Sequence, residues 1–293
     1  MPLTLNSDNS KNAIIEGVLY IVATPIGNLE DITVRAVKIL NGVDLIAAED
    51  TRTSGRLLSF YGISTKLTSY HEHNENKKAE ELVGLLKLKK SVALISDAGT
   101  PAVSDPGFRL VKLAIEHGIN VVPIPGASAA LTGLCASGLP TDAFVFCGFL
   151  PRKKGKRVDV IESLKNEKRT LIFYESPKRI LKLIDSLKDI LGDRKAVLCR
   201  ELTKLHEEFL RGTFTDLLND LSERNSVKGE CALVVSGKQD QLVSIDSLTE
   251  EICERLKLPD VKPSSLAREM ADKYSLRKKT VYEAIQKLTD SSY

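Results

Sequence analysis

Short apolar runs rich in β-branched residues alternate with amphipathic stretches along most of this chain. The first run, Val18–Ala23, has the length and composition of a buried strand. Further strands are predicted at 44–48, 92–96 and 120–124, and helices at 31–41, 53–61, 77–89 and 108–116. Because strands that alternate with helices form βαβ units, we predict an α/β fold with a largely parallel N-terminal sheet.

A second alternating block follows, after turn residues near 137–141. It predicts strands at 144–149, 170–176, 196–202, 206–214 and 231–237, and helices near 157–166, 178–190 and 215–224. The expected organisation is a flexible leader (1–16), an N-terminal α/β domain (17–138), a C-terminal α/β domain (139–238), a polar linker (238–247) and a helical module (248–293).

The last module has the apolar spacing of a helix-turn-helix. The residues expected to face inward are Leu266, Met270, Leu276, Val281, Ile285 and Leu288.

Three loops rich in Gly, Pro, Ser and Thr follow predicted strands. They are TPIGN (24–28), SDAGTPAVSDPG (96–107) and PIPGASAA (123–130). Each alone could be only a turn. Since the carboxyl ends of parallel strands meet at one edge of a sheet, the three together favour a ligand-binding site there.

Composition excludes several other classes of protein. The formal net charge is only +3, so any argument for a polyanionic partner must rest on local clusters. The first 17 residues are polar and no apolar run approaches the roughly 18 residues of a membrane span, which predicts a cytoplasmic, globular protein. The five cysteines contain no C-x-x-C pair and are expected to be buried, reduced thiols.

Common nucleotide and nucleophile motifs are missing. No two of the 18 glycines are separated by a single residue, so the dinucleotide fingerprint is absent. The stretch 148–156 is too long for a P-loop, and Ala130 stands where a nucleophile elbow needs glycine. His71 and His73 lack an evident third ligand, so we expect no metal.

Seven motifs occur in order between residues 17 and 237. They are TPIGNLEDITVR (24–35), AEDTR (48–52), SDAGTPAVSDPG (96–107), PIPGASA (123–129), GFLPRK (148–153), YESPKR (174–179) and RELTKLHEE (200–208). Together they closely resemble the tetrapyrrole methylase superfamily, in particular its branch that acts on small-subunit ribosomal RNA.

The resemblance implies an S-adenosylmethionine-dependent enzyme that methylates a cytidine ribose 2′-oxygen in the decoding region of 16S rRNA, within the small ribosomal subunit. It also implies a homodimer with the cofactor between two α/β domains. The implied cofactor contacts are Pro25, Ile95, Ser96, Asp97, Ser128, Ala129, Ala232 and Leu233. TPIGN replaces the glycine-rich first loop of tetrapyrrole-modifying relatives, which agrees with the RNA branch.

A ribose hydroxyl is a weak nucleophile, so a base or a nearby cation should assist its deprotonation. The candidates are Asp50, His71, Glu175 and Lys178, of which we favour the Glu175–Lys178 turn. Each carboxylate could instead be a helix cap or part of an ion pair.

Basic residues cluster at three places, of which the first directly follows the GFLP motif and the second is Lys178 with Arg179. The residues expected to contact RNA phosphates are Arg52, Arg152, Lys153, Lys154, Lys156, Arg157 and Arg179; a third cluster lies at 277–279. Such runs can also be simple solvated surface. Two alternatives stay open: a methyltransferase for a tetrapyrrole or corrinoid precursor, and a non-catalytic RNA-binding module.

Overall fold

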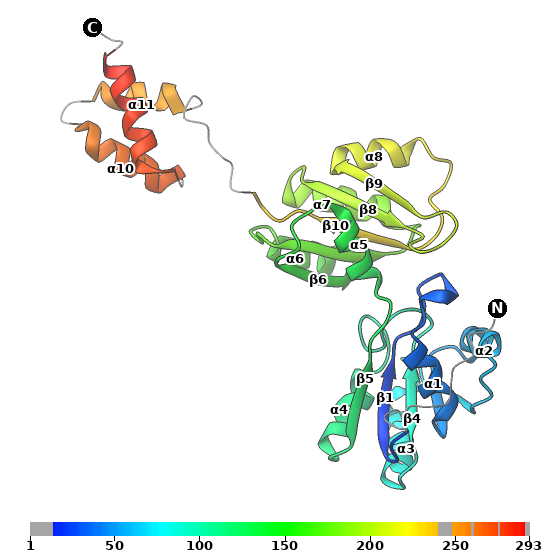
Figure 1. The fold of residues 1–293 in the computed structure, drawn as a ribbon. Coiled ribbons are helices and arrows are strands. Elements are labelled where there is room, and N and C mark those ends of the chain that lie inside the picture. Colours follow the sequence, from blue (N-terminus) through cyan, green and yellow to red (C-terminus); the bar gives the residue numbers. More distant parts are fainter. Residues whose placement is uncertain (1–13, 240–247, 259–260, 275, 291–293) are drawn as a thin grey trace. The chain divides into compact units, whose positions relative to one another are not determined.

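The computed structural model describes residues 14–239, 248–258, 261–274 and 276–290 (Figure 1). The chain forms two compact units, 1–238 and 239–293. Most of the predicted leader and linker lies outside the described residues. Among the residues that are described, no helix has the length and apolar content needed to cross a bilayer.

The first sheet is fully parallel, with the strand order β3-β2-β4-β1-β5. Its strands are β1 Val18–Val22, β2 Leu45–Ala48, β3 Leu67–Ser69, β4 Val92–Ile95 and β5 Asn120–Ile124. The helices around it are α1 Val34–Gly42, α2 Thr51–Phe60, α3 Glu75–Lys87 and α4 Phe108–Glu116, with a short 3-10 turn at Leu29–Asp31. The predicted α/β fold and parallel N-terminal sheet are therefore confirmed.

Both faces of this sheet are covered, which explains why its strands are apolar along their whole length. Val18, Tyr20 and Val22 belong to one buried cluster that includes residues of α1. Leu19 and Ile21 point the other way, into a cluster with residues of α3 and α4. The sequence of β1 thus has no polar positions because neither face meets water.

The second sheet is mixed, with the order β6-β7-β10-β8-β9. Its strands are β6 Phe144–Phe149, β7 Thr170–Glu175, β8 Lys195–Arg200, β9 Glu208–Thr213 and β10 Cys231–Val235. Only β6 and β7 pair in parallel; the other three pairs are antiparallel. The helices that follow its strands are α6 Lys154–Ser163, α7 Ile180–Leu191 and α8 Phe214–Ser222. The last strand, β10, lies in the centre of the sheet (Figure 1).

Helix α5, Ala129–Ser137, links the two sheets and was not expected from the sequence. Its Ala130 and Leu134 pack against the inner face of the second sheet, in one cluster with Ile172 and Ala232. Ile26, from the loop after β1, belongs to the same cluster. The loops of the first sheet are thereby held against a face of the second. The proposed division at 138/139 stays a prediction.

Arg194 is almost fully buried, at 9% exposure, and has no carboxylate partner among the described residues. Its guanidinium donates to main-chain carbonyls of Lys165 (2.6 Å), Leu191 (3.3 Å), Glu167 (3.4 Å) and Ser236 (3.5 Å). One side chain therefore connects three separate segments at the end of the second sheet.

The five cysteines are free, as expected for reduced thiols. Cys199 and Cys231 are buried, and Cys147 and Cys253 are partly buried. The prediction of burial was wrong for Cys135, which lies on the solvent side of α5.

The second unit is helical and has its own core. It contains α9 Thr249–Leu256, α10 Pro263–Tyr274 and α11 Lys278–Asp290. Of the six residues predicted to face inward, Leu266, Met270, Val281 and Ile285 are buried and the other two pack partly against them. The predicted helical module is confirmed.

Candidate active site

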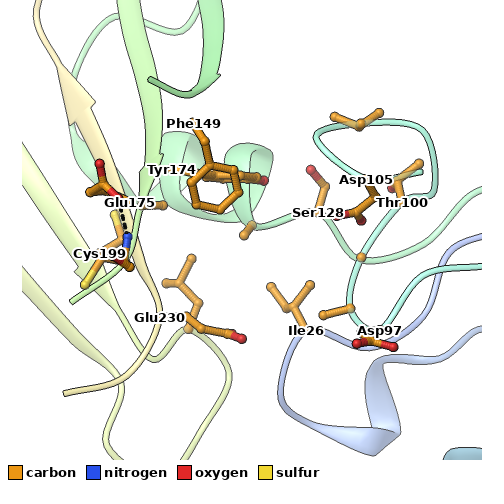
Figure 2. Close-up of a pocket in the computed structure, with 18 of the residues that line it drawn as sticks. Ile26, Asp97, Thr100, Asp105, Ser128, Phe149, Tyr174, Glu175, Cys199 and Glu230 are labelled. Atoms are coloured by element: carbon orange, nitrogen blue, oxygen red, sulfur yellow. Dashed lines mark hydrogen bonds between the residues drawn. The ribbon is translucent and has the colours of Figure 1, made fainter. Parts of the chain in front are cut away.

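A pocket of about 390 Å³ is bordered by loops of the first sheet and by the second sheet (Figure 2). This is the size range of small-ligand sites. The loop after β4 contributes Asp97, Ala98, Gly99, Thr100, Val103 and Asp105; the loop after β5 leads to Ser128 and Ala129; and the second sheet and its loops supply Phe149, Tyr174, Glu175, Cys199, Glu230 and Ala232.

The loops converge because β4, β1 and β5 are neighbours in the first sheet. Thr24 and Gly99 exchange two main-chain hydrogen bonds of 2.9 and 3.1 Å, which ties the loop after β1 to the loop after β4. Gly99 adopts a φ of 79°, a region that favours glycine. The predicted convergence of the three loops at one edge is confirmed.

Positive φ angles at residues other than glycine concentrate around this pocket. Five such residues occur in the described part of the chain. Ala102 and Ser104 lie in the loop after β4, and Glu201 and Thr203 lie in the loop after β8. Such conformations persist only where the surroundings enforce them, and they are common at functional sites.

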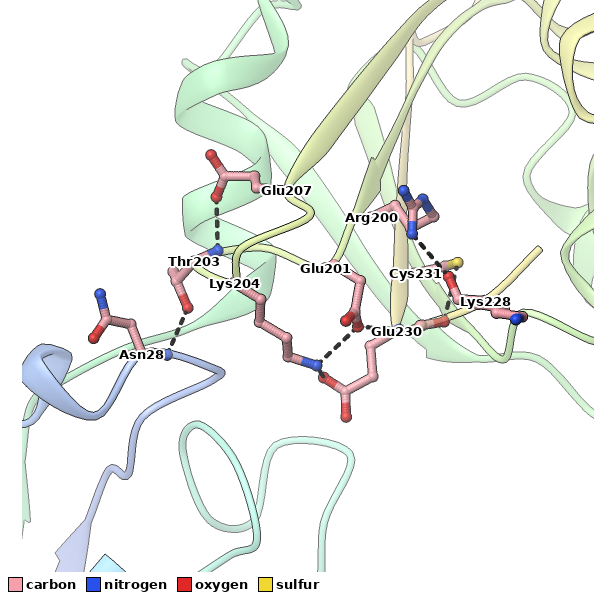
Figure 3. A network of polar contacts seen from close by, with 10 residues as sticks. Asn28, Arg200, Glu201, Thr203, Lys204, Glu207, Lys228, Glu230 and Cys231 are labelled. Carbon is pink, nitrogen blue, oxygen red and sulfur yellow. Dashed lines mark hydrogen bonds and ion pairs between the residues drawn. The ribbon is translucent and has the colours of Figure 1, made fainter. Parts of the chain in front are cut away.

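A polar network fastens the first loop to the second sheet (Figure 3). The main-chain N–H of Asn28 donates to Thr203 Oγ1 over 3.0 Å, and Lys204 Nζ pairs with Glu201 at 2.8 Å and Glu230 at 3.1 Å. Gly27 allows this approach, because a Cβ there would lie 2.5 Å from Lys204 Cγ. The RELTK segment therefore holds the TPIGN loop in place.

The pocket is lined by carboxylates, and none of its described lining residues is Lys, Arg or His. The acidic residues are Glu49, Asp97, Asp105, Glu175 and Glu230. Glu175 pairs with Arg179 at 2.5 Å and Glu230 with Lys204, but within the described ranges the other three have no ion-pair partner. The site is consequently suited to a cationic ligand.

The unpaired carboxylates have raised pKa values. Burial raises the pKa of Asp105 to about 6; the charge of Glu49 adds to this, and a hydrogen bond with the Ser96 side chain opposes it. Burial also raises the pKa of Glu49 and of Asp97. Each carboxylate therefore holds a proton more readily than it would in water.

The residues that the resemblance implied for cofactor binding divide into three groups. Four of them, Asp97, Ser128, Ala129 and Ala232, line the pocket. Pro25 and Ser96 line an adjoining pocket of about 360 Å³ that shares Ile26, Asp97, Ala98 and Glu230 with the first. The side chains of Ile95 and Leu233 point into the cores of the two sheets and line neither pocket.

The four candidate catalytic residues are not brought together. Glu175 lines the pocket, and its Oε1 also accepts from the main-chain N–H of Ser176. Asp50 is the N-cap of α2, where it accepts from the N–H of Arg52 at 2.8 Å. His71 is partly buried outside the lining, and Lys178 is exposed outside it. Asp50 and Glu175 thus have the cap and ion-pair roles that were left open as alternatives.

The candidate RNA-binding cations lie outside the pocket lining. Arg52, Arg152, Lys153, Lys154 and Lys156 are exposed, and Arg157 is partly buried. Arg179 also lies outside the lining; it is partly buried and forms an ion pair with Glu175.

In the part of the chain that the structure describes, no three His, Cys, Asp or Glu side chains lie close enough together to hold a metal ion. The rings of His71 and His73 lie 6.0 Å apart in an edge-to-face arrangement.

Sequence reasoning missed several lining residues. Asp105 lies in the SDAGTPAVSDPG motif, Phe149 is the second residue of GFLPRK, and Tyr174 is the first residue of YESPKR. The available signal was their place in these motifs. Glu49 had the same signal, since it lies in AEDTR, whereas Glu230 lies in none of the motifs and is recognised as a site residue only in the structure.

The fold and this cleft define a class of methyl-transferring enzyme, and the chain belongs to the tetrapyrrole methylase family. A family model described as Tetrapyrrole (Corrin/Porphyrin) Methylases matches residues 18–218. Proteins of this family take their methyl group from S-adenosylmethionine, so the protein is an S-adenosylmethionine-dependent methyltransferase.

Particular relatives are much more similar. A protein of Halalkalibacterium halodurans named Ribosomal RNA small subunit methyltransferase I is 52% identical over 227 residues, covering 78% of each chain. A protein of the same name from Mesorhizobium japonicum is 47% identical over 282 residues, covering 95% of this chain and 94% of its own.

Solved structures support the fold. Diphthine synthase matches with a TM-score of 0.62 and 16% identity, over 80% of this chain and 95% of that one. Uroporphyrin-III-C-methyltransferase from Thermus thermophilus matches with a TM-score of 0.54 and 18% identity, over 75% and 94%.

The pocket residues fit S-adenosylmethionine, which carries a sulfonium cation and an ammonium group. Glu49 and Asp97, two lining carboxylates without ion-pair partners in the described structure, complement these charges, and the apolar Ile26 and Leu202 can contact an uncharged part of the ligand. The small side chains at Ser128, Ala129 and Ala232 leave room for a compact molecule to approach the main chain.

Proposed function

We propose that the protein methylates the 2′-oxygen of a cytidine in the decoding region of 16S rRNA, in the cytoplasm, with the small ribosomal subunit as its substrate. The observation that carries this proposal is the name shared by relatives that are 44–52% identical over most of the chain. The homodimer implied by the family resemblance is part of the same proposal.

The charge of the pocket supports an RNA substrate over a tetrapyrrole precursor. A precursor macrocycle carries several carboxylates, and these would face Glu49, Asp97 and Asp105 without a compensating lysine or arginine in the described lining. A ribonucleotide can place its neutral ribose and base in the pocket and keep its phosphates outside. The acidic lining therefore disfavours the macrocycle.

The basic segment 152–157 supplies the positive charge that the pocket lining lacks. It begins three residues after Phe149, a lining residue at the end of β6. Arg152, Lys153 and Lys154 are exposed there and can pair with RNA phosphates, which position a substrate without reading its sequence.

The chemistry is a methyl transfer, for which the bound cofactor supplies a methyl group on a positively charged sulfur. Ser128, Ala129 and Ala232 would form the wall against which the cofactor binds, and Glu49 and Asp97 would balance its positive charge. The Arg179–Glu175 pair fixes the end of β7 beside it. The main contribution of these residues to the rate is alignment of the ribose oxygen for in-line displacement.

The proposal predicts that deletion of the gene removes one ribose methyl group from 16S rRNA. Mass spectrometry of nuclease fragments would detect the loss, and purified protein with S-adenosylmethionine should restore the methyl group to small subunits from the deletion strain. Uroporphyrinogen serves as the competing substrate in the same assay. An unchanged methylation pattern in the deletion strain, or transfer to the macrocycle alone, would contradict the proposal.

Charge reversal in the basic segment should weaken RNA binding and flatten its salt dependence. For Lys153→Glu with Lys154→Glu, loss of two phosphate contacts should make the slope of log K against log salt concentration shallower by about 1.5. The matched control is Lys87→Glu with Lys89→Glu, two exposed lysines at the end of α3, where the chain leads into the amino-terminal end of β4. Equal slopes for both double variants and the wild type would show that 153–154 does not contact phosphates.

A further inference from the structure

We infer that the edge of the pocket between Phe149 and Asp105 receives the target nucleoside, with the base stacked on Phe149 and the ribose hydroxyl giving its proton to Asp105. This inference rests on the proposed function and assigns residues that the family resemblance did not supply.

Phe149 has the features of a stacking platform. It lines the pocket and is 54% exposed, so part of its ring remains free for contact with a ligand. Its ring packs edge-to-face on Tyr174 with a centroid distance of 5.6 Å, as Figure 2 shows, so a ring face is available for another aromatic group. Bases that are recognised outside a helix commonly stack on such side chains.

Tyr174, on which Phe149 packs, is itself held in place. The hydroxyl of Tyr174 accepts a hydrogen bond of 2.9 Å from the main-chain N–H of Ala130, and its ring also packs on Phe146 at 5.0 Å. The strand pairing shifts between Phe146 and Gly148, which marks a β-bulge directly before Phe149. Bulges redirect the side chains that follow them and are frequent beside active sites.

The position of Phe149 also connects the pocket to the basic segment. Arg152 follows it by three residues, so a nucleotide whose base lies on Phe149 has its phosphates next to the cations of 152–157. The neutral base and ribose of the substrate would thus lie in the acidic pocket, and its anionic phosphates would lie outside it beside the basic segment.

Asp105 is held by a loop that is fixed on both sides. Gly148 of β6 leaves the room that Ser104 needs, because a Cβ at 148 would lie 2.7 Å from Ser104 Oγ. On the other side a Cβ at Gly107 would lie 2.9 Å from Leu94 Cδ2. With Ala102 and Ser104 at positive φ, the loop places Asp105 in the pocket lining.

Asp105 is also the least engaged of the pocket carboxylates. Glu175 and Glu230 are neutralised by cations, and Asp97 accepts from the main-chain N–H of Asp50 at 3.0 Å. Glu49 accepts from the main-chain N–H of Asp97 at 3.4 Å. In the described structure Asp105 has neither a cation nor a main-chain N–H, and its raised pKa, about 6, is suited to accepting a proton near neutral pH.

The ribose 2′-oxygen forms a bond to the methyl carbon with one of its electron pairs and gives its proton to the Asp105 carboxylate. The electron pair of the broken carbon–sulfur bond stays on sulfur, which changes from a sulfonium to a neutral thioether. The products are a 2′-O-methyl ribose, the demethylated cofactor and a protonated Asp105.

The first test is Asp105→Asn, which keeps the shape and removes the base. We expect kcat to fall about 100-fold or more. Affinity for small subunits, measured by filter binding, should change less than about threefold. Calorimetry with S-adenosylmethionine and thermal melting check that the variant is folded and binds its cofactor. Asp142→Asn, at an exposed position outside the pocket, is the control.

The pH dependence of the wild type tests the same assignment without a variant. Because Asp105 must be deprotonated, kcat/KM should fall about tenfold per pH unit below pH 6, and this limb should be absent from the residual activity of Asp105→Asn. Wild-type kcat in Asp105→Asn, or a wild-type kcat/KM that is flat between about pH 5 and about pH 7, would overturn the role of Asp105.

The role of Phe149 is tested by binding. In the presence of S-adenosylhomocysteine, Phe149→Ala should bind unmethylated small subunits about tenfold more weakly, while Phe149→Tyr keeps the affinity. Phe108→Ala, a 68% exposed phenylalanine outside the pocket, is the control. Equal affinity of the Phe149→Ala and Phe108→Ala variants would overturn the stacking role. Absence of methyl transfer to the small subunit by the wild type would instead refute the proposed function.

Discussion

Replacing Ala129 by leucine should lower the affinity for S-adenosylmethionine about 100-fold or more, which corresponds to about 2.7 kcal/mol. Ala129 is the first residue of α5 and lines the pocket, so a larger side chain there occupies space that the ligand needs. Leucine is a good helix former, and the helix itself should therefore persist. Isothermal titration calorimetry measures the loss directly.

Ala136→Leu is the matched control, because Ala136 lies on the same helix, is exposed and does not line the pocket. Its cofactor affinity should equal that of the wild type. If Ala129→Leu binds the cofactor within about threefold of Ala136→Leu, the cofactor does not lie against the start of α5.

Replacing Arg194 by methionine should lower the free energy of unfolding by about 3 kcal/mol. Methionine fills a similar volume but removes the guanidinium donor from the carbonyls of Lys165, Leu191 and Ser236, of which that of Ser236 is buried and the other two are partly buried. The carbonyl of Glu167 still accepts from the main-chain N–H of Lys238. Arg194→Lys should restore little of the lost free energy of unfolding, since one ammonium group cannot reproduce the planar fork of the guanidinium. Urea unfolding followed by circular dichroism reports the change.

Arg169→Met is the comparison for this variant. Arg169 lies near the same loop, but its exposed side chain forms a surface ion pair with Glu167. Its unfolding midpoint should be that of the wild type, because surface ion pairs contribute little. A midpoint for Arg194→Met that matches Arg169→Met would mean that the carbonyls find other partners.

The fold could largely be predicted from the sequence because most elements have a clear period. The predicted bounds of α4 and β5 agree with the structure, and so do those of β6. Two elements were missed for physical reasons. Strand β3 is only Leu-Thr-Ser, too short to show an apolar run, and α5 is apolar on all sides, so it has no amphipathic pattern.

The site was predicted only in part. Loops at the ends of adjacent strands can be recognised from their composition, which predicted a ligand site at this edge of the sheet. The assignment of Asp97 and Ser128 came from the family resemblance, and both line the pocket. Asp105 could not be distinguished in the same way from Asp50 or Glu175. Its difference lies in burial and in the absence of a cation or main-chain N–H partner in the described structure, and both depend on non-glycine residues at positive φ, which the sequence does not reveal.

The central place of β10 affects the order in which a newly made chain can become an enzyme. Strands β7 and β8 leave the ribosome first, but their shared neighbour is synthesised after both of them. Ala232, one wall of the cofactor pocket, lies on that late strand. A chain that lacks β10 therefore has an incomplete cofactor pocket. Cofactor binding can stabilise only the sheet that already contains β10. During translation, methyl-transfer competence should accordingly arise in one late step and not gradually.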